Sequence, residues 1–233
     1  MCVVCVASEA ISSCYYHIHI TITVMICHRC VCEVCCKVVD VAFVVDSSLK
    51  TQGQSAWTQM INFVNLVIDR LTLATYSLRV SFVRYGDRAN VEFRFNQYTD
   101  SRSAKQRISS IAYLGNAGNN LADALDSLRN QVFQTNLGAR QLAPWVAVVI
   151  TDRSPSLRTT DTVSSARQDR AAGIQIVAVG IVESRQLDTN ILNQIAFTPA
   201  RVTTVDQYSQ LTTTAYRVAD WICFSRLCEL CNV

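Results

Sequence analysis

The 233-residue chain is predicted to fold as an α/β domain with a doubly wound, mostly parallel sheet, helices on both faces and one antiparallel edge strand. Three almost wholly apolar runs, at residues 38–45, 145–150 and 174–179, carry this prediction. Such runs are typical of strands buried on both faces, which occur in parallel sheets. Segments with apolar residues every three or four positions alternate with these runs, as in repeated strand-helix units.

Six elements are expected in the first part of the domain. They are strands at 38–45, 78–85 and 89–95 and helices at 55–71, 103–112 and 120–133. The first strand is interrupted only by Asp40, and the first helix carries a stripe of apolar residues on one face. The strands at 78–85 and 89–95 are joined by a turn containing Gly86 and Asp87, the one hairpin-like connection expected.

Six further elements complete the expected sheet and its helices. They are strands at 145–150, 174–179 and 201–204 and helices at 163–172, 188–195 and 208–222. Gly173 ends the first of these helices, and the last helix closes the domain with one apolar face. The strand at 201–204 has the weakest signal of the set.

The composition limits the kind of protein this is. Half of the residues are hydrophobic and 17% are charged, which is ordinary for a globular protein and excludes a disordered or fibrous one. The length suits one large domain with tails. The formal net charge is only +3 and the 21 Lys and Arg residues are scattered, so we expect no nucleic-acid partner.

The eleven cysteines lie only at the two ends of the chain. Eight fall in residues 1–36, three in the last eleven residues, and none between them. We therefore expect a Cys-rich N-terminal segment at 1–36, one domain at 37–223 and a Cys-containing tail at 224–233. A disulfide between the candidates Cys36 and Cys223 would enclose roughly 190 residues and stabilise the fold by about 5 kcal/mol in the chain-entropy model.

Eight of the nine remaining cysteines form four C-x-x-C pairs. They are Cys2 with Cys5, Cys27 with Cys30, Cys32 with Cys35, and Cys228 with Cys231. Four thiolates from two such pairs suit tetrahedral zinc. The second and third pairs nearly abut, without the spacer that usually separates zinc-binding pairs, so disulfides or unpaired thiols are favoured.

The N-terminal segment has three interpretations. Residues 10–28 contain no formally charged residue, which is typical of a secretion signal or a membrane segment. Residues 17–24 instead alternate polar with apolar, which is the period of a strand. A signal, an additional edge strand and a stray translated extension all remain open.

Two carboxylates mark the candidate functional site. Asp46 follows the first buried strand and Asp152 follows the strand at 145–150. Ligands of doubly wound sheets bind where such strands end, so these side chains are expected to share one crevice. Either Asp alone more often caps the next helix. The two together, with the Ser48 hydroxyl nearby, favour an oxygen-lined site for a hard cation such as Mg²⁺.

At this point the sequence resembles a known family. The segment 41–48, VAFVVDSS, is similar to the opening strand and first metal loop of von Willebrand factor type A domains, whose metal-ion-dependent adhesion motif reads Asp-x-Ser-x-Ser. Segments similar to later strands and helices of that Rossmann-like fold follow in the family's order, at 80–86, 124–125, 148–152, 176–181 and 205–211. With cysteines just outside the domain, the matrilin and type VI collagen branch is the most similar one.

The resemblance implies a metal site that this chain only partly retains. Asp46, Ser48 and Asp152 match the family's ligands, and Asn119 aligns with a threonine of the second metal loop. Lys50 stands where the second serine belongs, so it is expected to disrupt the site. An ammonium about 4 Å from a cation would repel even a single charge by roughly 4 kcal/mol at an effective dielectric of 20, and by less than about 1 kcal/mol when it swings into water.

We therefore expect no cofactor, or only weakly bound Mg²⁺ or Mn²⁺. In an alternative arrangement, the Lys50 ammonium takes the ion's place and neutralises both carboxylates. Arg153, beside Asp152, is interpreted either as part of the rim of the site or as a solvated loop cation. Arg167 and Arg170, near Asp161 and Asp169, are interpreted as a solvated helix face.

The expected function is non-catalytic. All three histidines precede the domain, so no Ser-His-Asp set can form within it, and no Gly-rich phosphate loop is present. An Asp-based phosphatase or nucleotide-dependent enzyme is the rival class. The resemblance implies a secreted adhesion or extracellular-matrix module that binds a matrix or cell-surface protein and no small-molecule substrate, with membrane association left open. The alternatives are an adhesion domain that binds an acidic partner residue through Mg²⁺, and a purely structural module.

Overall fold

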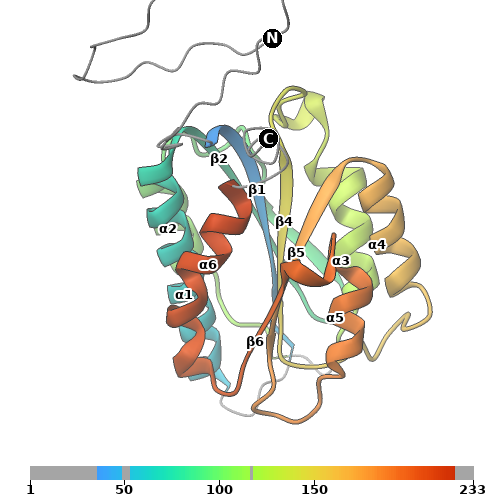
Figure 1. Cartoon of the computed structure of the whole chain (residues 1–233). Helices are drawn as coiled ribbons and strands as arrows, with labels where there is room; N and C mark the ends of the chain where they lie inside the picture. Colours follow the sequence, from blue (N-terminus) through green and yellow to red (C-terminus); the bar gives the residue numbers. More distant parts are fainter. Residues whose placement is uncertain (1–35, 49–52, 116–117, 224–233) are drawn as a thin grey trace, which may run out of the picture. The chain divides into compact units, whose positions relative to one another are not determined.

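The computed structural model describes residues 36–48, 53–115 and 118–223, and these form one α/β domain (Figure 1). The strands are β1 (Cys36–Asp46), β2 (Thr75–Tyr85), β3 (Ala89–Phe93), β4 (Trp145–Thr151), β5 (Ile174–Ile181) and β6 (Val202–Val205). The helices are α1 (Gln54–Ala74), α2 (Ser101–Ser109), α3 (Leu121–Ser127), α4 (Thr162–Ala171), α5 (Thr189–Ile195) and α6 (Leu211–Cys223). A π-helical turn, Leu128–Val132, continues α3, and a 3₁₀ turn, Tyr208–Gln210, leads into α6.

The strands form a six-stranded sheet in the order β3-β2-β1-β4-β5-β6. All neighbours are parallel except β3, which pairs with β2 in the antiparallel direction. The strand order reverses between β1 and β4, because the chain adds β2 on one side of β1 and β4 on the other. The predicted fold class is confirmed, including the single antiparallel edge strand.

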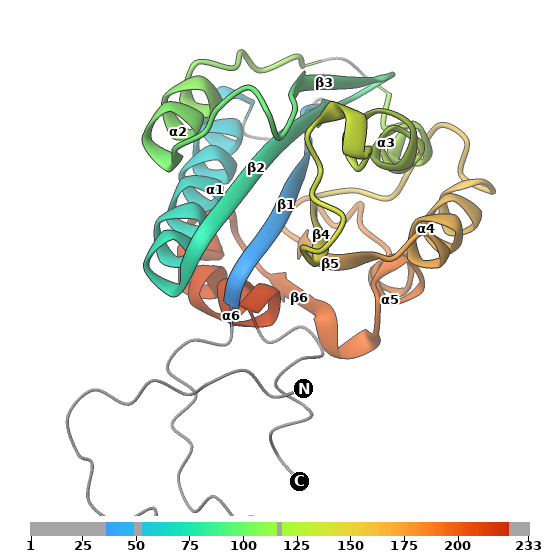
Figure 2. The same ribbon diagram turned by 90° about the horizontal axis from the view of Figure 1, so that it is seen from above.

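The two faces of the sheet are covered by different helices. Figure 2 shows α1, α2 and α6 on one face and α3, α4 and α5 on the other. Successive residues of β1 alternate between the two layers: Phe43 packs in the core under α1 and α6, and Val44 packs in the core under α3. Both side chains are fully buried. This burial on both faces explains why β1 is apolar at nearly every position.

The expected elements are all present. Some of their ends are shifted, in two cases because a side chain accepts a hydrogen bond from the backbone. The helix expected at 103–112 begins at Ser101, because the Asp100 carboxylate accepts from the Ser103 amide at 2.9 Å and caps it. The strand expected at 89–95 ends at Phe93, because the Arg94 amide donates to the Gln97 side chain instead of to a strand. The helix expected at 120–133 changes to a π-helix in its last turn.

Asp40, the one polar residue of the first strand pattern, is buried in the amino-terminal half of β1. The Arg140 guanidinium and backbone amide both bind its carboxylate, with an Nη2–Oδ1 distance of 2.6 Å. This ion pair joins β1 to the loop before β4, at the end of the sheet opposite the candidate site.

Several expectations fall outside the described residues or their side chains. Both views place the start of β1 and the end of α6 at the same end of the domain (Figures 1 and 2). Nothing is described of the Cys36 side chain, so its pairing with Cys223 stays a prediction. The segments 1–35 and 224–233 and residue Lys50 lie outside the described residues. In the part of the chain that the structure describes, no helix has the length and apolar character needed to cross a membrane.

Candidate functional site

A buried polar cluster lies where β1 and β4 end, at the reversal of the strand order. Asp46 is the last residue of β1, and Thr151 and Asp152 stand at the end of β4. All three are fully buried. The structure thus places both predicted carboxylates at the same edge of neighbouring strands, as the doubly wound topology requires.

The Asp46 carboxylate accepts hydrogen bonds from four protein donors. Oδ1 accepts from the amide and the hydroxyl of Ser48, at 2.9 and 2.6 Å. Oδ2 accepts from the Asn119 side-chain amide at 2.7 Å and from the Thr151 hydroxyl at 3.0 Å. Four donors compensate for the loss of water around a buried charge and stabilise the ionised form. Ser48 and Asn119 therefore lie beside Asp46 as expected, and Thr151 is a further neighbour that the sequence did not predict.

The Asp152 carboxylate is also engaged by its own chain. The phenol of Tyr208, in the turn before α6, donates to Oδ2, and the Arg153 Nε lies 3.7 Å from Oδ1. The backbone carbonyl of Asp152 accepts from the Ser184 hydroxyl at 2.7 Å. The arrangement ties the end of β4 to the loops that follow β5 and β6. It also places Arg153 beside the site, as the rim interpretation expected.

Two tyrosine phenols beside the carboxylates are held in the neutral form. Burial, followed by the nearby Asp46 charge, raises the pKa of Tyr85 well above its usual value. Burial, followed by the Asp152 charge and the hydrogen bond to it, raises the pKa of Tyr208. Both phenols therefore stay protonated, and Tyr208 remains a hydrogen-bond donor to Asp152 at neutral pH.

Asn119 is fixed by the loop that follows β4. Its amide donates to the Ser156 hydroxyl at 2.9 Å, and its carbonyl accepts from the amides of Ser156 and Leu157 at 2.9 and 3.1 Å. Its side-chain amide nitrogen points to Asp46, which leaves Oδ1 buried without a hydrogen-bond partner among the described residues. That oxygen is an acceptor in need of a donor or a cation.

The predicted ligands already accept hydrogen bonds from their own chain, with which a hard cation would compete. Mg²⁺ requires near-octahedral coordination, and here both Asp46 oxygens and Asp152 Oδ2 already accept protein hydrogen bonds. Of the four predicted ligands, which all lie in the described ranges, only Asn119 has a buried side-chain oxygen without any hydrogen-bond partner among the described residues. No group of three or more His, Cys, Asp or Glu residues in the described part of the chain is placed to hold a metal.

The rim of the cluster exposes apolar side chains. Leu114 is 37% exposed and Leu157 is 39% exposed. Leu114 is held by its amide, which donates to the Ser47 hydroxyl at 2.8 Å, and Leu157 lies against Gly118, where a Cβ would come within 2.7 Å of it. These two leucines belong to segments whose backbones are anchored to the buried cluster.

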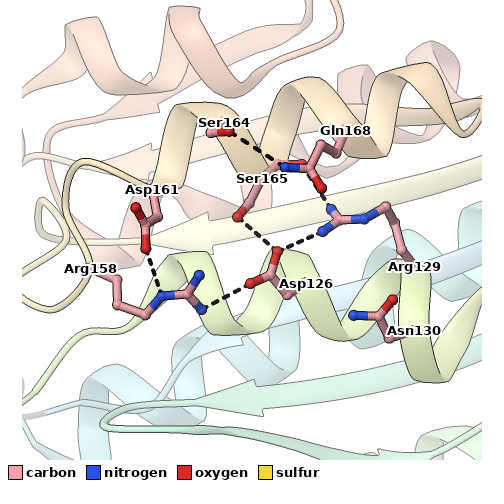
Figure 3. A pocket seen from close by; sticks show the side chains of 8 residues that line it. All are labelled: Asp126, Arg129, Asn130, Arg158, Asp161, Ser164, Ser165 and Gln168. Carbon is pink, nitrogen blue, oxygen red and sulfur yellow. Dashed lines mark hydrogen bonds and ion pairs between the residues drawn. The ribbon is translucent and has the colours of Figure 1, made fainter.

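A second polar cluster lies between α3 and α4 and lines an open pocket of about 430 Å³ (Figure 3). Polar side chains line it: Asp126, Arg129, Asn130, Arg158, Asp161, Ser164, Ser165 and Gln168. Arg158 bridges Asp126 and Asp161, with distances of 2.9 Å to each carboxylate. Arg129 binds Asp126 at 2.7 Å from the other side. Since the charges neutralise one another, the cluster acts as a clamp between two helices and the loop before α4.

The prediction of a solvated helix face is wrong at Asp169. Asp169 is fully buried and its Oδ1 lies 2.6 Å from Arg129 Nη1, because α4 packs this side chain against α3. Burial raises its pKa to about 7 in spite of that partner. Arg170 donates to the carbonyls at the end of α5, and only Arg167 is exposed as expected.

The fold and the position of the cluster define a doubly wound α/β domain whose candidate recognition surface is the carboxyl edge of the sheet. Residues 40–217 match the model of the von Willebrand factor type A domain, and the chain belongs to that family.

The curated relatives place the chain near the expected branch. Matrilin-3 of Mus musculus is 28% identical over 196 residues, which cover 82% of this chain and 39% of the relative. The collagen alpha-6(VI) chain of Homo sapiens is 25% identical over 190 residues, 82% of this chain and 8% of that one. The chain spans less than half the length of these relatives. The predicted resemblance to matrilins and type VI collagen is confirmed.

Solved structures share the fold. Proximal thread matrix protein 1 from the mussel byssus superposes with a TM-score of 0.73 at 22% identity, covering 82% of this chain and 47% of that one. A structure of the same mussel protein with a zinc-occupied MIDAS motif superposes with a TM-score of 0.72 at 21% identity. At these identities the likeness shows the fold alone.

Proposed function

We propose that this domain is a non-catalytic protein-binding module of the extracellular matrix. It docks a matrix or cell-surface protein at the carboxyl edge of the sheet, around Asp46, Ser48, Asn119 and Asp152. The family and the relatives named above, which are matrilins and collagen chains, support a structural or adhesive role outside the cell. A catalytic role has no support from the site, because Asp46 already accepts four hydrogen bonds.

The observation that carries this proposal is the saturation of Asp46 by the chain's own donors. An ion that bound there would have to replace several hydrogen bonds to a buried charge, each worth about 1.5–3 kcal/mol. We infer that the adhesion motif is degenerate and holds Mg²⁺ or Mn²⁺ weakly or not at all. Lys50, expected beside the carboxylates, would act in the same direction. The partner is then held by direct contacts, for which Leu114 and Leu157 offer exposed apolar surface on anchored segments.

A second candidate is a metal-dependent adhesion domain, in which a bound Mg²⁺ completes its coordination with an acidic residue of the partner. One observation favours it: Asn119 Oδ1 is buried and lacks a hydrogen-bond partner among the described residues, as a metal ligand would without its metal. Zinc occupies the MIDAS motif of the mussel protein, so a domain of this fold can carry an ion at that motif.

Binding to immobilised matrix proteins in Mg²⁺ and in EDTA separates these candidates. We would test a panel of collagens and matrix glycoproteins with the wild type, Leu157→Ser at the rim, and Leu142→Ser as a control. Leu142 is 95% exposed in the loop that precedes β4, whereas the candidate site lies where β4 ends. We expect binding that survives EDTA and falls at least tenfold in Leu157→Ser only. Loss in EDTA supports the metal-dependent candidate, and equal binding by both variants indicates that this edge is not the interface.

A further inference from the structure

We propose that Tyr208 helps to keep a metal ion out of the site, because its phenol donates to an Asp152 oxygen and a metal ion or its bound water would compete with that hydrogen bond. This inference rests on the proposed degenerate site and deepens it, since it names a residue outside the adhesion motif as the determinant of metal specificity. Tyr208 is then a residue that determines metal specificity, and the removal of its single hydroxyl group is expected to increase metal affinity.

The ring of Tyr208 is held rigidly in place. It lies in the 3₁₀ turn before α6, is 1% exposed and belongs to the core under α1 and α6. Its backbone amide donates to a Glu183 carboxylate oxygen at 3.1 Å. The preceding Gln207 and the following Gln210 form a reciprocal capping box at the start of the turn. The phenol therefore cannot swing into solvent to vacate Asp152, unlike a long flexible side chain at the rim.

The bond between Tyr208 and Asp152 joins two buried groups. Asp152 is fully buried, and its Oδ2 accepts a hydrogen bond from the phenol of Tyr208. A hydrogen bond to a buried charge corresponds to about one to two decades in an equilibrium constant. A cation that used Asp152 would have to overcome that factor.

Removal of the Tyr208 hydroxyl alone is expected to make Asp152 available to a metal ion. In Tyr208→Phe the ring still fills its place in the core, while Asp152 Oδ2 loses a donor and gains from a cation or its bound water. Tyr216 provides a matched control, because it lies on α6, is 54% exposed and stacks on Arg70 at 5.0 Å, away from the site. Tyr216→Phe makes the same chemical change without touching Asp152.

The experiment is calorimetric titration of the full chain with Mn²⁺, in the wild-type background and in a Lys50→Ser background that restores the motif's second serine. We expect Tyr208→Phe to bind Mn²⁺ at least tenfold more tightly than its parent in one or both backgrounds. Tyr216→Phe should leave affinity unchanged. Adding Asp152→Asn to Tyr208→Phe should remove the gain, which would locate the ion at this carboxylate.

The outcomes distinguish this inference from the proposed function. If the wild type does not bind Mn²⁺ and Tyr208→Phe gives no gain in either background, the inference is overturned and the degenerate site stands. If the wild type already binds at micromolar concentration, the degenerate site is overturned. In that case a further tenfold gain in Tyr208→Phe would still support the role of Tyr208, and its absence would overturn both.

Discussion

Replacement of Asp169 by Asn should flatten the dependence of stability on pH. Asp169 is fully buried in the clamp between α3 and α4, with a pKa of about 7 against an ordinary value of 3.8. Two effects oppose each other here. Arg129 favours the charged carboxylate, and the pKa of Arg129 is itself raised by Asp126 and Asp169. Burial of Asp169 outweighs that attraction, because Arg129 is shared between two carboxylates.

The raised pKa of Asp169 determines the direction in which stability changes with pH. The folded state holds the proton of Asp169 more tightly than the unfolded state, so the stability from this group is fully present below pH 3.8 and is lost as the pH rises through 7. Each pH unit between those two values changes the free energy of unfolding by about 1.4 kcal/mol. From pH 5 to pH 8 the loss from Asp169 therefore approaches about 3 kcal/mol. Carboxylates with ordinary or lowered pKa are ionised in both states over this window and contribute little.

Urea denaturation of the wild type and Asp169→Asn at pH 5, 6, 7 and 8 measures this difference. Between pH 5 and pH 8 the free energy of unfolding of the wild type should fall by up to about 3 kcal/mol more than that of the variant. The slope is the readout, because an amide also changes the hydrogen bond to Arg129. Asp220→Asn, an exposed change on α6, should follow the wild type. Parallel curves for the wild type and Asp169→Asn would refute a raised pKa at this position.

Three further predictions concern the ends of the domain and the motif. Arg140→Ala leaves the buried Asp40 carboxylate without its ionic partner and should lower the free energy of unfolding by about 3–5 kcal/mol in urea titrations. Lys50→Ser should raise Mg²⁺ affinity by about three decades or more where the ammonium lies about 4 Å from the ion, since it would there repel even a single charge by roughly 4 kcal/mol; an unchanged affinity by calorimetry would show that Lys50 does not face the site. Peptide mapping under non-reducing conditions should recover Cys36 joined to Cys223, and recovery of both as thiols would contradict that pairing.

The fold could be predicted from the sequence because its strands are buried on both faces. Runs such as 145–150 contain no polar residue, so their pattern admits few other structures. The juxtaposition of Asp46 and Asp152 followed from topology alone, because parallel neighbouring strands end at one edge. No knowledge of side-chain packing was needed for either prediction.

The contacts that the sequence could not predict are long-range and depend on packing. Tyr208 reaches Asp152 across 56 positions, and Thr151 reaches Asp46 across 105. A threonine at a strand end and a tyrosine before a helix look ordinary until the sheet brings them together. Asp169 was placed in solvent because a charged residue on a short helix is usually exposed. Its burial arises from the packing of α4 against α3, which no local pattern records.

The chain's own donors are proposed to close the candidate site to metal. A thermal unfolding titration of the full chain with Mg²⁺ and Mn²⁺ is the most direct test of this proposal. Asp46→Ala is the control. An ion that binds only the folded state stabilises it by about 2.7 kcal/mol at a hundredfold excess over its dissociation constant, which is a readily measured shift. We predict no saturable rise in Tm for the wild type with either ion. A saturable rise that Asp46→Ala abolishes would contradict a closed site and would establish a working metal-ion-dependent adhesion site.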